Sequence, residues 1–94
     1  MRTLLVTYDL DRPGQDYTDV LKEIKKFAWA RLSESSYAVH TDLEPQQLFN
    51  RLSPYLDSND TLYVITLNRP YAGQGPREVN SWLERYLTYA QVPA

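Results

Sequence analysis

The most constraining feature of this sequence is a strand with apolar side chains on both faces. Thr61–Leu67 reads TLYVITL and is rich in the β-branched and aromatic residues that favour strands. Because side chains alternate along a strand, Leu62 and Val64 share one face, and Tyr63 and Ile65 share the other. A strand that is apolar on both sides needs cover on both sides. The rest of the chain must therefore supply two covering layers.

The other segments predict the elements that surround this strand. They are a strand at Thr3–Leu10, a helix at Gln15–Ala28, strands at Trp29–Ser33 and Ser35–Thr41, a helix that begins at Pro45, and a helix at Pro76–Ala90. The helices are predicted from apolar residues at three- and four-residue spacing. One longer strand in place of the pair after the first helix is the alternative.

This order predicts an α+β fold built on one antiparallel sheet. A βαββαβ unit of this length is typical of a ferredoxin-like sheet with both crossover helices on one face. We assign residues 1–68 to that unit, and residues 69–94 to a loop and an extra C-terminal helix of the same domain. Asn68–Gly75, with two glycines and a proline, is a candidate hinge for that helix.

The second face of such a sheet would be left open. Leu5 and one apolar set of the Thr61–Leu67 strand would then meet water. Either a homodimer that packs sheet against sheet, or the last helix folding over the face, would solve this problem. The sequence leaves both solutions open.

Composition narrows the classes of function. The 94 residues contain no cysteine, which excludes disulfides and thiolate metal sites, and they carry a net charge of −2, which argues against general nucleic-acid binding. Lys22, Lys25, Lys26 and Arg31 still form a local basic cluster, for which a solvated helix face is the simpler explanation. The N-terminus has no long apolar run, so we expect a cytoplasmic protein with no membrane segment.

The first strand ends in the pair Tyr8-Asp9, and Asp9 is the strongest candidate for chemistry. The carboxyl end of a strand is a frequent place for ligands in α/β sheets, and Mg²⁺ prefers carboxylate oxygens. The alternative is that Asp9 only helps to form the turn that Asp11-Arg12-Pro13-Gly14 predicts. Arg12 and Arg31 are the best candidates for phosphate contacts, and Tyr8 is a candidate for stacking on a base.

Three short motifs resemble a known family. They are Tyr8-Asp9, the segment Arg31…Ser35-Ser36-Tyr37, and Asn59-Asp60 before Leu62-Tyr63-Val64-Ile65. Across about residues 1–68 the chain resembles the small CRISPR-associated adaptation nucleases and their VapD-like toxin relatives, and it is most similar to SinR-like bacterial proteins of that group. The resemblance implies a ferredoxin-like homodimer that cleaves RNA or DNA with Mg²⁺ or Mn²⁺. It also implies that Asp9, one from each subunit, is the catalytic metal ligand.

Two features depart from the family pattern. Members of this family usually end in a strand that clasps the partner subunit, whereas a helix is predicted here, and this chain is acidic. A non-catalytic dimeric scaffold or binding protein is therefore the alternative hypothesis. A small-molecule module with Asn68–Gly75 as a lid is a third.

Overall fold

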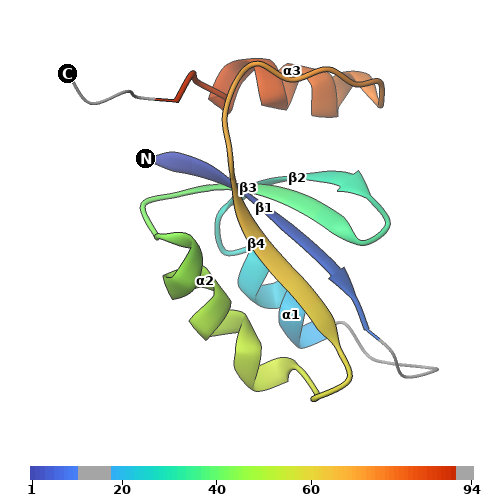
Figure 1. The fold of residues 1–94 in the computed structure, drawn as a ribbon. Helices are drawn as coiled ribbons and strands as arrows, with labels where there is room; N and C mark the ends of the chain where they lie inside the picture. Colours follow the sequence, from blue (N-terminus) through green and yellow to red (C-terminus); the bar gives the residue numbers. More distant parts are fainter. Residues whose placement is uncertain (11–17, 91–94) are drawn as a thin grey trace.

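Four strands form one antiparallel sheet in a computed structural model that describes residues 1–10 and 18–90 (Figure 1). The strands are β1 (Arg2–Asp9), β2 (Ala28–Ser33), β3 (Ser36–Thr41) and β4 (Thr61–Leu67), in the order β2-β3-β1-β4. The helices of the described part are α1 (Thr18–Ile24), α2 (Pro45–Leu52) and α3 (Arg77–Tyr86), with a 3₁₀ turn at Ser53–Tyr55. The predicted α+β class with one antiparallel sheet is confirmed.

Helices α1 and α2 cover one face of the sheet (Figure 1). Alternate residues of β1 point to this face, where Leu4 and Val6 are fully buried and Tyr8 is nearly so. Leu48 and Leu52 of α2 meet them from the helical layer, and both side chains are 0% exposed. The core of the domain therefore lies between this face and the two helices.

Helix α3 lies on the other side of the sheet (Figure 1). The Thr3 hydroxyl donates a hydrogen bond to the Tyr86 carbonyl at 3.3 Å, and the His40 ring lies 4.5 Å from the Tyr86 ring. Thr3 and His40 are register partners on neighbouring strands, so both project from this second face. Of the two solutions that the sequence left open, the last helix does fold over the sheet.

The cover that α3 provides is partial. Tyr63 and Ile65 of β4 point to the same face as α3, yet they are 63% and 50% exposed. Leu5, the register partner of Ile65, is half-buried. The β1–β4 half of the second face therefore keeps an exposed apolar surface, which we call the Tyr63–Ile65 face.

The first helix is shorter at its C-terminal end than predicted. Within the predicted helix Gln15–Ala28, α1 ends at Ile24, and Ala28 already pairs with His40 as the first residue of β2. The Phe27 amide donates to the Ile24 carbonyl and closes the turn between them. The prediction of two strands here is confirmed, since β2 and β3 are joined by a turn with a register shift between Arg31 and Ser33.

The last helix also ends earlier than predicted. It ends at Tyr86, and Leu87 is extended and buried, whereas the predicted helix ran to Ala90. Arg69 explains this end: its guanidinium donates to the Leu87 carbonyl at 2.6 Å and to the Glu84 carbonyl at 2.8 Å. These carbonyls belong to the last turn of the helix and the residue after it, which have no partner within the helix. The segment proposed as a hinge is thus tied to the end of α3.

Helices in the described ranges are all too short and too polar to cross a bilayer.

Candidate functional site

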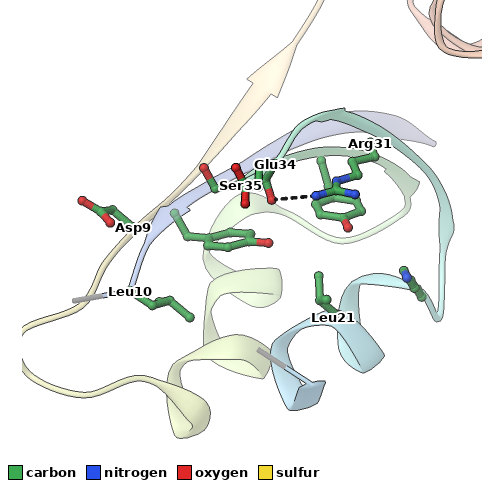
Figure 2. Close-up of a pocket in the computed structure, with 9 residues that line it drawn as sticks. Asp9, Leu10, Leu21, Arg31, Glu34 and Ser35 are labelled. Atoms are coloured by element: carbon green, nitrogen blue, oxygen red, sulfur yellow. Dashed lines mark hydrogen bonds between the residues drawn. The ribbon is translucent and has the colours of Figure 1, made fainter. Parts of the chain in front are cut away.

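A cavity of about 620 Å³ opens where β1 ends, beside α1 and the β2–β3 turn (Figure 2). The residues that line it are Tyr8, Asp9, Leu10, Leu21, Lys25, Arg31, Glu34, Ser35 and Tyr37. We call it the β1-end pocket. Its volume lies within the range of small-molecule sites in proteins.

The hydrogen bonds of the β2–β3 turn place this turn beside the end of β1. The Tyr8 amide donates to the Ser35 carbonyl at 3.0 Å, one residue beyond the regular ladder. Next to it, the Thr7 and Ser36 hydroxyl oxygens lie 2.9 Å apart. Residues far apart in the sequence therefore meet at one pocket because β3 pairs with β1 in this register.

Three of the predicted site residues line this pocket. Tyr8 is 7% exposed and forms part of its wall, while Asp9 and Arg31 are exposed at its edge. Figure 2 shows Asp9 and Arg31 on opposite sides, with the Asp9 carboxylate directed away from Arg31. Arg12, the fourth predicted residue, lies outside the described residues. The site is thus assembled from β1 and the β2–β3 hairpin.

Arg31 is positioned by the turn that follows it. Its Nε donates to the Ser33 carbonyl at 3.3 Å, and its Nη2 donates to the Glu34 carbonyl at 3.5 Å. Within the described residues, no carboxylate lies within salt-bridge distance of this guanidinium. Main-chain acceptors orient the group without neutralising its charge.

The lysines of the basic cluster have different surroundings. Lys26 lies in the turn after α1 and pairs with Glu23 at 2.6 Å. Lys25 instead turns toward the pocket, with its Nζ 4.9 Å from the centre of the Trp29 ring. Lys25 and Arg31 thus bring two positive charges to the β1-end pocket, and sequence spacing alone could not separate Lys25 from its neighbours.

Away from the pocket, His40 and Tyr71 belong to the contacts around α3. His40 Nδ1 lies 3.2 Å from the Thr3 hydroxyl. Burial lowers the pKa of His40, the positive N-terminal amine lowers it further, and the negative charge of Asp42 partly raises it again. The Tyr71 hydroxyl donates to the Glu84 carboxylate at 2.5 Å. This bond raises the pKa of Tyr71 and lowers the pKa of Glu84.

Asp60, which belongs to one of the three family motifs, closes the turn before β4. Its carboxylate accepts from the Asp57 amide at 2.8 Å, and its amide donates to the Asp57 carbonyl at 3.1 Å. This turn orders the chain before β4.

Residues 1–10 and 18–90 contain no group of three His, Asp or Glu side chains able to hold a metal ion. Asp9 is the exposed carboxylate that ends β1. Mg²⁺ binds proteins through one or two carboxylates, with water and phosphate oxygens as its other ligands, so a single Asp9 supplies at most part of a metal site.

No family model, curated protein or solved structure matches this chain.

Proposed function

We propose that this protein is a metal-dependent nuclease that acts as a homodimer in the cytoplasm, with Asp9 of each copy as a metal ligand. The observation that carries the proposal is the position of Asp9. It is exposed at the end of β1, on the same face as the exposed Tyr63 and Ile65. Packing two copies through that face would bring the two carboxylates toward one axis.

The strand order supports the fold that this proposal needs. In the sheet order β2-β3-β1-β4, all neighbours are antiparallel, and α1 and α2 lie on one face. We propose that this is a ferredoxin-like arrangement with α3 added. The resemblance of the Tyr8-Asp9 motif to the adaptation nucleases points to the same fold.

The Tyr63–Ile65 face supports the dimer. A two-fold interface uses the same surface on both partners, so the exposed apolar face of one copy can be buried against the same face of a second copy. Thr7, which pairs with Tyr63, is followed on the same face by Asp9, about 7 Å further along the strand. Asp9 therefore lies beside the proposed interface rather than under it, where it remains open to a substrate.

Asp9 supplies what a hydrolytic metal site needs from the protein. Two carboxylates close to one axis repel each other, and a divalent cation relieves this repulsion. Mg²⁺ or Mn²⁺ bound there would polarise a phosphodiester and lower the pKa of a bound water. Lys25 and Arg31 provide positive charge for the phosphate backbone on the far side of the pocket.

The second candidate function is a non-catalytic dimeric scaffold or binding protein. The exposed Tyr63 and Ile65 favour it, because an apolar face supports association whether or not Asp9 binds a metal. The two candidates differ in the cleavage that they predict.

A cleavage assay separates these functions. Purified protein is incubated with labelled RNA and DNA, single- and double-stranded, in Mg²⁺, in Mn²⁺ and in EDTA. The nuclease proposal predicts cleavage of at least one substrate with either ion and none in EDTA. Intact substrates under every condition would reject the nuclease and leave the binding protein.

A further inference from the structure

The β1-end pocket combines three kinds of surface. Its inner wall is apolar and aromatic, its edge carries two cations, and the acidic Glu34 and the hydroxyl-bearing Ser35 complete the edge. A nucleotide presents the matching set of a flat base, an anionic phosphate, and ribose hydroxyls or base amino groups.

The inner wall suits a flat ring. Tyr8 and Tyr37 come from β1 and β3 on the helix-facing side of the sheet, and Leu10 and Leu21 approach the same space from the end of β1 and from α1 (Figure 2). The centroids of the Tyr37 and Trp29 rings lie 5.8 Å apart, so Trp29 packs against Tyr37 and helps to fix its position. Tyr8 and Tyr37 are 7% and 3% exposed, so each presents only a small part of its ring to the cavity, and the half-buried Leu21 adds apolar contact beside them.

The cations suit a phosphate. Arg31 donates to the carbonyls of Ser33 and Glu34, which orient its guanidinium at the pocket edge. Lys25 lies over the Trp29 ring in a cation–π contact. Hydrogen bonds between charged donors and phosphate oxygens are among the stronger polar contacts in proteins.

A carboxylate argues against a simple anion site. Glu34 lines the same cavity as the two cations and would repel a lone phosphate. Carboxylates are, however, regular acceptors for ribose hydroxyls in nucleotide sites. The mixture of charges therefore selects a ligand that has donors as well as an anionic group.

We propose that the β1-end pocket binds one unpaired nucleotide, with its base against Tyr8, Tyr37 and Leu21 and its phosphate held by Lys25 and Arg31. A base inside a duplex is stacked on both sides and cannot enter such a pocket, so the ligand is a free nucleotide or a nucleotide of a single strand. The link to cleavage rests on the proposed function. The binding needs no metal and no dimer.

Calorimetric titration in EDTA tests this site with the four nucleoside 5′-monophosphates as probes. We expect at least one of them to bind the wild-type protein. Lys25→Met and Arg31→Met should each weaken its Kd about tenfold or more, because each removes a charged donor to the phosphate. Lys22→Met is the matched control, since Lys22 is exposed on α1 and does not line the pocket, and it should leave the Kd unchanged.

Competition then identifies the source of the nucleotide. A single-stranded oligonucleotide that displaces the monophosphate assigns the pocket to nucleic acid, and failure to displace it assigns the pocket to free nucleotides. The proposal is overturned if no monophosphate binds, if inorganic phosphate displaces it equally well, or if the Kd is unchanged in both Lys25→Met and Arg31→Met. Circular dichroism of each variant confirms that the fold is intact. Because no cleavage is expected in EDTA, this titration measures binding alone. Failure of every monophosphate to bind would therefore reject the nucleotide pocket without rejecting the proposed nuclease.

Discussion

Asp9→Asn is expected to abolish metal-dependent cleavage and to leave the fold intact. The substitution keeps the size of the side chain but removes the negative charge that attracts the cation. A bound metal supplies several kcal/mol of transition-state stabilisation, so we expect a loss of about a hundredfold or more in cleavage rate. Asp9 is exposed at the end of its strand, and its loss should cost little stability.

Asp19→Asn provides the matched control. Asp19 is an exposed aspartate in the first turn of α1, on the helical side of the sheet, and it does not line the β1-end pocket. Cleavage rates measured with both variants under one Mg²⁺ titration should show loss only in Asp9→Asn. Equal cleavage rates in the wild-type protein and Asp9→Asn would show that Asp9 is not a catalytic residue.

Arg69→Met is expected to loosen α3 from the sheet. The guanidinium donates to the carbonyls of Leu87 and Glu84, and Met keeps much of the apolar length without these donors. The Leu87 carbonyl belongs to a buried residue, which has little access to water as a substitute. We expect the free energy of unfolding to fall by about 2 kcal/mol in a denaturant titration, since hydrogen bonds from charged donors contribute on that order.

Glu84→Gln separates the main-chain bonds from the ion pair. The Glu84 carboxylate pairs with Arg69 at 2.9 Å but is exposed, so this contact should contribute little. The variant keeps both carbonyl acceptors and should unfold at nearly the wild-type denaturant concentration. Hydrogen exchange adds a local measure: faster exchange in α3 than in β1 is expected for Arg69→Met. If Glu84→Gln destabilised the protein as much as Arg69→Met, the ion pair rather than the carbonyl bonds would hold the helix.

The strand faces were predictable because alternation is a local property. Leu62 is buried and Tyr63 is exposed, as expected for neighbours that point to opposite faces of β4. The same alternation accounts for the burial of Leu4, Val6 and Tyr8 on the helical face of β1. The order of the elements then allowed one antiparallel sheet to be predicted.

The ends of the helices were less predictable, because distant contacts set them. The apolar stripe of the last helix continues through Leu87, and nothing near Leu87 in the sequence signals a stop. Arg69 and the extended backbone at Leu87 fix the end instead. A periodic pattern shows which side chains are apolar but does not show which surface they contact.

The candidate site was predicted in part. Tyr8, Asp9 and Arg31 were identified from their motifs, and they line one pocket. Glu34 could not be predicted as a site residue, because only the register of β1 with β3 brings the hairpin turn beside the end of β1. Lys25 could not be told from Lys22 and Lys26, because its contact with Trp29 depends on where α1 ends. Chemistry that depends on pairing across strands cannot be read from spacing along the chain.

In the proposed dimer, two copies meet through the Tyr63–Ile65 face and bring their Asp9 residues close together. The chain has no cysteine, so Asp9→Cys gives each copy a single thiol, and Asp19→Cys gives a matched thiol on the helical side. A short bismaleimide added to dilute protein, followed by denaturing electrophoresis, measures whether the two thiols of a dimer lie within its reach. We predict a covalent dimer for Asp9→Cys and none for Asp19→Cys. A sedimenting dimer in which position 9 does not cross-link, or a protein that sediments only as a monomer, would contradict the claim.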